Sequence, residues 1–105
     1  MSRATETFWK WLLAQLPCVI CSRFEYSGVK PSLHHVAPGS SKRSVFGMVP
    51  LCHPHHQGPA GFHGMGGKAF LRMYRPPGES EYGLIIWTLE DLATYLRPRL
   101  TDFKW

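Results

Sequence analysis

Two short stretches of the sequence decide the fold: PCVIC at residues 17–21 and VPLCHPHH at residues 49–56. They hold all three cysteines of the chain and three of its six histidines. The spacings C-x-x-C and C-x-x-H allow two turns each to present a pair of ligands to one tetrahedral zinc ion. We therefore expect a structural Zn²⁺ site formed by Cys18, Cys21, Cys52 and His55.

Two other interpretations of the cysteines are open. The three thiols could be buried apolar groups beside a surface histidine, because free cysteine is among the residues most often buried. Cys18 and Cys21 could also form a redox dithiol, although the sequence lacks the βαβ pattern expected around such a pair. His53 could replace His55 as the zinc ligand only with a tighter turn.

The chain is small, and its composition is rich in turn-forming residues. Its 105 residues suffice for one domain, which we expect to span residues 1–105. Glycine and proline supply 10 and 9 residues, so helices and strands should be short, and a bound ion should substitute for missing apolar burial. We expect an α+β fold, with a small zinc-stapled core between two helices.

Composition also bears on where the chain acts and what it binds. No run of ~18 apolar residues is present, so we expect no membrane span. Three cysteines, two of them in a C-x-x-C, suit a reducing cytoplasm, most simply that of a bacterial host or its phage. The formal net charge of +5 favours a polyanionic partner such as nucleic acid.

Apolar periodicity predicts a helix towards each end of the chain. Apolar residues three and four positions apart predict one helix over 6–16, ended by Pro17, and another over 79–97, ended by Pro98. A strand over 84–87 competes with the second helix. The core at 17–67 should contain strands over 32–36 and 45–51 and a short helix from His53. The segment after the core should contain one or two helical turns over 68–74.

The motifs PCVIC, LHHV at residues 33–36 and VPLCHPHH occur in an order that resembles the HNH family of ββα-metal nucleases. The likeness is greatest to the small phage-type members similar to the Ref recombination nucleases, and it covers residues 16–67, about half of the chain. It implies a ββα-metal core and an endonuclease that hydrolyses DNA phosphodiester bonds. It also implies a catalytic divalent ion, Mg²⁺ or a similar one, besides the structural zinc.

The resemblance gives roles to four histidines. It implies that His35 is the general base, and that His34 and His56 contribute to the catalytic metal site. His63 corresponds to a further ligand. The resemblance implies a spacing of about four residues after His56, but His63 lies seven positions after it, with a glycine-rich insertion between the two. Gly47 stands where the family has its middle asparagine, so a backbone carbonyl or Ser44 would have to orient His35.

Basic residues near these motifs suit contacts with a phosphate backbone that do not read bases. Lys42 and Arg43 lie in a loop over 39–44, and Lys68 and Arg72 lie in the segment after the histidines. The departures at Gly47 and His63 also motivate an alternative from another class. In that alternative the chain is a catalytically inactive zinc-stapled module that binds nucleic acid or a protein partner.

Overall fold

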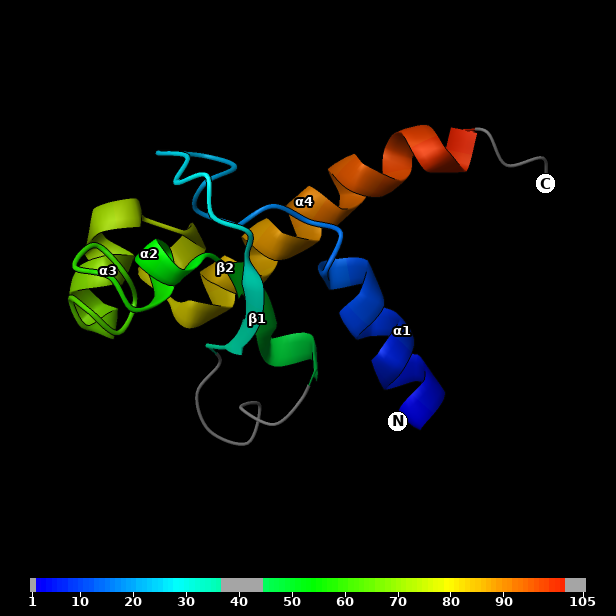
Figure 1. Ribbon diagram of the computed structural model, residues 1–105, viewed down its shortest axis with the longest axis horizontal. Helices are drawn as coiled ribbons and strands as arrows, with labels where there is room; N and C mark the ends of the chain where they lie inside the picture. Colours follow the sequence, from blue (N-terminus) through cyan, green and yellow to red (C-terminus); the bar gives the residue numbers. More distant parts are fainter. Residues whose placement is uncertain (1, 37–44, 102–105) are drawn as a thin grey trace.

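The computed structural model describes residues 2–36 and 45–101, which form a small mixed α+β fold with one two-stranded sheet. The elements, in which η marks a 3-10 helix, are α1 (Arg3–Leu13), β1 (Ser32–His35), η2 (Val45–Gly47), β2 (Met48–Leu51), α2 (His53–His56), α3 (Gly67–Tyr74), η3 (Pro77–Glu79) and α4 (Glu81–Thr101). In Figure 1 the sheet lies between α2 and α3 at one end and α1 at the other, and α4 runs from the middle along an outer border. The expected mixed fold is confirmed at this level.

The N-terminal helix lies three residues earlier than the sequence predicts. Instead of residues 6–16 it spans Arg3–Leu13, because Ser2 caps it and its hydroxyl accepts a hydrogen bond from the Thr5 amide at 3.1 Å. Beyond Leu13 the chain tightens into a turn in which the Leu16 amide donates to the Leu13 carbonyl. Leu16 is therefore outside the helix, although it stays buried.

The sheet is an antiparallel pair of four-residue strands. Ser32 lies opposite Leu51 and His35 lies opposite Met48, with no break between these pairs. The second strand is shorter than the predicted 45–51, because residues 45–47 form the turn η2, whose last carbonyl accepts a hydrogen bond from the Val36 amide at 3.1 Å. In a regular strand neighbouring side chains point to opposite faces, so His34 and His35 diverge.

The C-terminal helix is longer than predicted. It begins at Glu81, after the separate turn η3, and continues through Pro98 to Thr101. A proline removes one backbone N–H, here the donor to the Thr94 carbonyl. Because only three helical residues follow Pro98, this single lost bond does not end the helix. The competing strand over 84–87 is wrong, since these residues are helical.

Two apolar clusters hold the elements together. The larger combines the cysteines and the sheet with α3 and the start of α4, and consists of Cys18, Val19, Ile20, Cys21, Val36, Val49, Leu51, Cys52, Phe70, Leu71, Tyr74 and Leu84. The smaller joins α1 to the middle of α4 through Leu12, Leu13, Leu16 and Leu92. Within the described ranges, none of the helices combines the length and the apolar character needed to cross a membrane.

Arg23 fastens the turn over residues 18–24 to α4. Its guanidinium lies 2.9 Å from an oxygen of Asp91 and 3.0 Å from an oxygen of Glu90, and it donates to the Trp87 carbonyl at 3.1 Å. The same group lies 4.8 Å from the centre of the Trp87 ring. Only 19% of the Arg23 side chain is exposed, so these charge-assisted contacts are partly shielded from water.

We expect Arg23→Met to lower the free energy of unfolding by about 2 kcal/mol, because it removes several charge-assisted hydrogen bonds but keeps an unbranched side chain. The matched variant Arg75→Met removes an exposed guanidinium whose ion pair with Glu79 is 3.9 Å long. It should change the free energy by less than about 0.5 kcal/mol. Urea unfolding in the presence of zinc measures the free energy of unfolding of both variants. An effect of Arg23→Met as small as that of Arg75→Met would contradict the proposed role of Arg23.

Candidate metal centre

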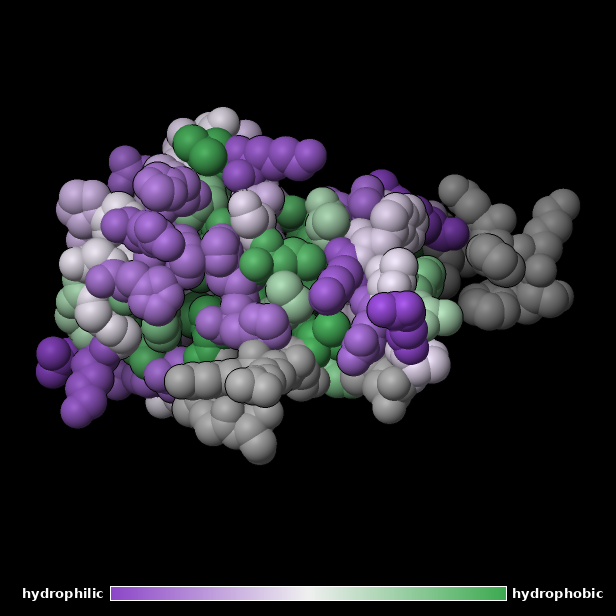
Figure 2. Space-filling view, turned by 60° about the horizontal axis from the view of Figure 1, so that its bottom comes forward, coloured by the Kyte–Doolittle hydropathy of each residue, from purple (hydrophilic) through white to green (hydrophobic). Residues whose placement is uncertain are grey.

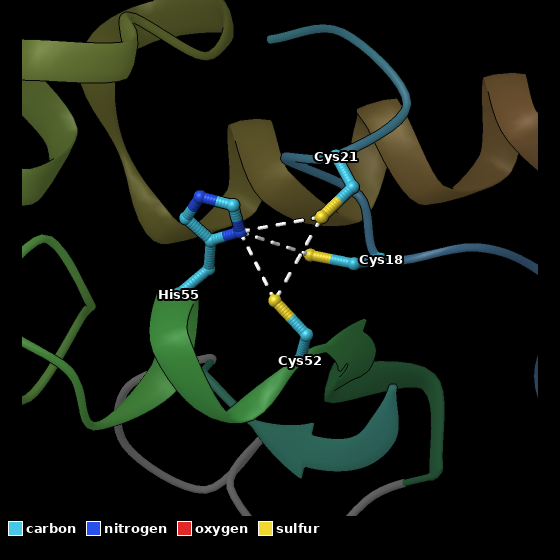
Figure 3. Close-up of side chains that lie close together, drawn as sticks. All are labelled: Cys18, Cys21, Cys52 and His55. Atoms are coloured by element: carbon cyan, nitrogen blue, oxygen red, sulfur yellow. Dashed lines mark hydrogen bonds between the residues drawn. The ribbon is translucent and has the colours of Figure 1, made fainter. Parts of the chain in front are cut away.

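Three cysteines and one histidine converge on one point in the interior. Cys18 and Cys21 come from the turn after α1, Cys52 lies at the junction of β2 and α2, and His55 lies in α2, so that all four side chains point inward (Figure 3). All four are buried, and their ligand atoms lie within 4.8 Å of one another. Among the described residues, this is the one group of three or more metal-binding side chains that converges in this way.

Most of the distances between the ligand atoms are close to those of a tetrahedral zinc site. The Nδ1 atom of His55 lies 3.6, 3.4 and 3.1 Å from the sulfurs of Cys18, Cys21 and Cys52, and the sulfurs of Cys21 and Cys52 are 3.7 Å apart. Zinc bonds of about 2.3 Å to sulfur and about 2.0 Å to nitrogen place tetrahedral ligands roughly 3.5–3.8 Å apart. The four residues could therefore hold a zinc ion, and no carboxylate belongs to the group.

Backbone hydrogen bonds explain why the two ligand pairs meet. The first pair lies on a tight turn in which the Ser22 amide donates to the Cys18 carbonyl at 3.0 Å. This turn is joined to the end of β2, because the Val19 amide donates to the Pro50 carbonyl at 2.9 Å. Cys52 then caps α2, which turns His55 back towards the thiols. His55, and not His53, is the histidine of the group.

Ser27 donates hydrogen bonds to two of the sulfurs. Its hydroxyl lies 3.0 Å from the sulfur of Cys52 and 3.5 Å from that of Cys21, and its amide donates to Cys21 at 3.4 Å. Burial raises the pKa of the Cys21 thiol, but the hydrogen bonds from Ser27, Cys18 and Cys52 outweigh it, so the pKa lies below its ordinary value. Donors to sulfur stabilise the thiolate form that binds metal.

Burial shifts the pKa of two of the other ligands, Cys18 and His55. Burial raises the pKa of the Cys18 thiol to about 12. Burial also lowers the pKa of His55, which keeps its imidazole neutral. Because a buried thiol does not ionise readily alone, a metal ion that binds here would displace the proton of Cys18, and its binding would then be coupled to folding of this core.

Three more histidines adjoin one another beside this centre. The rings of His34 on β1 and His56 on α2 are stacked, with centres 3.6 Å apart, and the ring of His63 meets that of His56 edge-on at 4.7 Å. Burial, together with the positive charge of neighbouring histidines, lowers the pKa of His56 to about 4 and also lowers that of His34. Both imidazoles are therefore neutral at neutral pH.

A glycine-rich loop over residues 57–66 carries His63 back to α2. The His63 amide donates to the His56 carbonyl at 2.7 Å, and Tyr74 on α3 donates to the Ala60 carbonyl at 3.0 Å. A Cβ atom on Gly64 would lie 1.7 Å from the Gly58 carbonyl oxygen, so only glycine permits this approach of the two backbone segments. The insertion inferred from the sequence thus places His63 next to His56.

Three of the remaining predicted site residues lie at the surface. His35 is exposed at the end of β1, and Lys68 and Arg72 are exposed one helical turn apart on α3. Figure 2 shows hydrophilic side chains gathered over the end of the molecule that carries α2 and α3. Lys42 and Arg43, like Ser44, lie outside the described residues.

Sequence reasoning missed Ser27, Arg23 and Tyr74. Ser27 lies six positions after Cys21 in a segment without regular structure, so no spacing rule indicated that it reaches the sulfurs. Tyr74 was expected only as part of a helical turn, yet its ring meets that of His55 edge-on with centres 6.0 Å apart. The one signal in the sequence that could have indicated such a donor is the presence of a polar residue soon after the C-x-x-C pair.

We expect the purified protein to bind one equivalent of zinc through the four converging side chains. His55→Ala should reduce the bound zinc well below one equivalent, because it removes one of the four ligands. The control His53→Ala removes an exposed histidine from the same helix and should keep full zinc content. Elemental analysis after dialysis measures both variants, and full zinc in His55→Ala would contradict the ligand assignment.

We expect Ser27→Ala to weaken zinc binding about tenfold, because the loss of donors next to metal ligands typically costs 10–100-fold in affinity. Ser22→Ala is the matched control, since the Ser22 hydroxyl bonds the Val19 carbonyl and Asp91 instead of a sulfur. Competition with a chromophoric chelator measures the two affinities. Identical affinities in the two variants would show that Ser27 does not support the site.

Comparison with protein families identifies a nuclease family. A family model described as recombination enhancement, RecA-dependent nuclease matches residues 3–94, which is most of the chain. No curated protein and no solved structure gives a significant match. The matched residues include the converging cysteines and His55 as well as the three adjoining histidines. The chain therefore belongs to the family of RecA-dependent recombination-enhancement nucleases.

Proposed function

We propose that the chain is an HNH-type endonuclease that hydrolyses phosphodiester bonds in DNA. The observation that carries this proposal is the contact of His34, His56 and His63, which come from a strand, a helix and a loop. Membership of a nuclease family supports the reaction class. The order of β1, β2 and α2 along the chain agrees with the strand-strand-helix arrangement that the resemblance implies.

The zinc centre would fix the spacing of the proposed catalytic side chains. Cys52 and His55 tie α2 to the turn that holds Cys18 and Cys21, and the Pro50 carbonyl ties that turn to β2. His56 follows His55 directly, so the same constraint holds the His56 ring against β1. A hydrolytic site needs such fixed positions, because small displacements of catalytic groups lower the rate strongly.

The donor chemistry of the histidine group fits a divalent ion. Neutral imidazoles bind metals, and the lowered pKa values of His34 and His56 keep these rings neutral. When bound, the ion supplies charge that stabilises the phosphorane-like transition state and the leaving oxygen. Their nitrogens do not converge as the zinc ligands do, so His34 and His56 must leave their stacked arrangement to act as ligands together.

We propose His35 as the general base. It follows His34 on β1, but in this regular strand its exposed ring lies on the face opposite to His34. A bulge or bend of β1 would have to turn the His35 ring towards the histidine group before it could act there. A histidine within hydrogen-bond reach of the attacking water molecule can take its proton. Lys68 and Arg72, with Lys42 and Arg43, would hold the flanking phosphates of the DNA.

The second candidate is a catalytically inactive zinc module that binds nucleic acid or protein. The observation in its favour is that the histidine nitrogens do not converge, whereas the cysteine and histidine ligands of the zinc centre do. Both candidates require zinc and both tolerate basic surface residues. They differ only in whether a divalent ion supports cleavage that depends on His35.

The proposal predicts nicking of supercoiled plasmid that requires a divalent ion. His35→Ala should lower the rate at least about 100-fold, because it removes the proton acceptor, but should retain its zinc. His53→Ala is the control, since it removes an exposed histidine that has no proposed role. The assay compares Mg²⁺ with Mn²⁺ and Ni²⁺, because imidazole nitrogen suits the latter two better than Mg²⁺.

The family description names RecA, so the same assay includes reactions with RecA bound to single-stranded DNA. Cleavage at the same rate by His35→Ala and the unchanged protein would overturn the role of His35. Absence of cleavage under every ion, with and without RecA, would favour the inactive zinc module.

A further inference from the structure

The helix α4 has a second apolar face that the core does not cover. Leu84, Thr88 and Leu92 are buried on its inner side. On the outer side, Tyr82, Ile86 and Leu89 are 51%, 44% and 46% exposed. A surface helix of a small domain normally places polar residues on the side that faces water. Here the exposed apolar residues extend over about two turns of α4.

The spacing of these residues is that of a helix-to-helix seam. Tyr82, Ile86, Leu89 and the exposed Ala93 follow one another at intervals of four, three and four residues. This is the a/d pattern of a coiled coil, which keeps one apolar stripe facing a partner helix. Isolated apolar residues are common on protein surfaces, but a continuous stripe of this kind indicates an interface. We refer to these four residues as the α4 stripe.

The charges beside the α4 stripe indicate which helix would cover it. Glu81 begins α4 and Glu79 ends the turn η3 just before it, whereas Arg97 and Arg99 lie towards the C-terminal end of α4. A second copy of α4 packed in the opposite direction would place each acidic end beside a basic end. The helix dipoles would also be antiparallel, which is the favourable arrangement. Parallel packing would instead bring like charges together.

The sizes of the side chains agree with antiparallel self-association. A two-fold axis midway between Ile86 and Leu89 places these two residues opposite each other. The same axis places Tyr82, the largest residue of the α4 stripe, opposite Ala93, the smallest. Such alternation of large and small side chains lets two apolar surfaces interlock. A two-fold interface of this type is self-complementary, so one stripe suffices for both copies.

We propose that the chain forms a homodimer through antiparallel packing of the α4 stripes of two copies. The occupant of the stripe is thus a second copy of this chain. The interface lies on the outer side of α4, whereas the zinc centre and the histidine group lie among the turn after α1, β1, α2 and the loop behind it. The proposal does not depend on the nuclease activity, and dimerisation leaves both sites in place.

Sedimentation velocity of the zinc-loaded protein tests the proposal. We expect a species of twice the 12.0 kDa mass of one chain at micromolar concentrations. Ile86→Glu combined with Leu89→Glu should give the monomer, because four buried carboxylates would face one another across the two-fold axis. Met73→Glu is the matched control, since Met73 is 57% exposed on α3 and lies outside the α4 stripe. It should remain dimeric.

Charge reversal at the ends of α4 tests the direction of packing. Arg97→Glu with Arg99→Glu should raise the dissociation constant about tenfold, because acidic residues then meet Glu79 and Glu81 of the other copy. Mixing this variant with Glu79→Lys/Glu81→Lys should restore the dimer. Circular dichroism and zinc content confirm that each variant is folded.

The proposal would be overturned if the protein without substitutions sediments as a monomer at all accessible concentrations. It would also be overturned if the variant with Ile86→Glu and Leu89→Glu is folded, contains zinc and still forms a dimer. Charge reversal without effect on the dissociation constant would overturn the antiparallel arrangement.

Discussion

The fold depends on the convergence of Cys18, Cys21, Cys52 and His55 on one buried point. The two halves of this group are far apart in sequence, since His55 lies 34 positions after Cys21. A sheet of only two four-residue strands and a one-turn helix cannot bury enough apolar surface to hold such a connection alone. A tetrahedral ion held by these four residues would supply the missing constraint, because each ligand pair would restrict the direction of its own turn.

The same constraint positions the histidines. His56 is the neighbour of His55, so the helix that delivers a zinc ligand also sets the His56 ring against His34. The glycine-rich loop then brings His63 to His56 by close backbone contact. Around the centre, Ser27 supports the sulfurs, and Arg23 joins the cysteine turn to α4. The proposed catalytic group is thus built on a rigid base, although its own rings are not held by a bound ion.

The sequence predicted the zinc ligands because their spacing carries the chemistry: a C-x-x-C and a C-x-x-H can each close on one ion. Their convergence is confirmed, as are the two strands, the short helix from His53 and the two flanking helices. The predicted ends of the flanking helices were wrong, because Ser2 caps α1 and α4 continues through Pro98, and apolar periodicity reports neither feature. Ser27 and Arg23 were missed because their partners are distant in sequence and known only once the chain is folded. The roles of His34, His35, His56 and His63 stay predictions.

X-ray absorption at the zinc edge tests the central claim most directly, because it reports the atoms bound to the ion without relying on activity. Three sulfurs at about 2.3 Å and one nitrogen at about 2.0 Å are the result that the convergence of Cys18, Cys21, Cys52 and His55 predicts. A first shell of only nitrogen and oxygen atoms would place the ion elsewhere and would contradict the account of the fold given above.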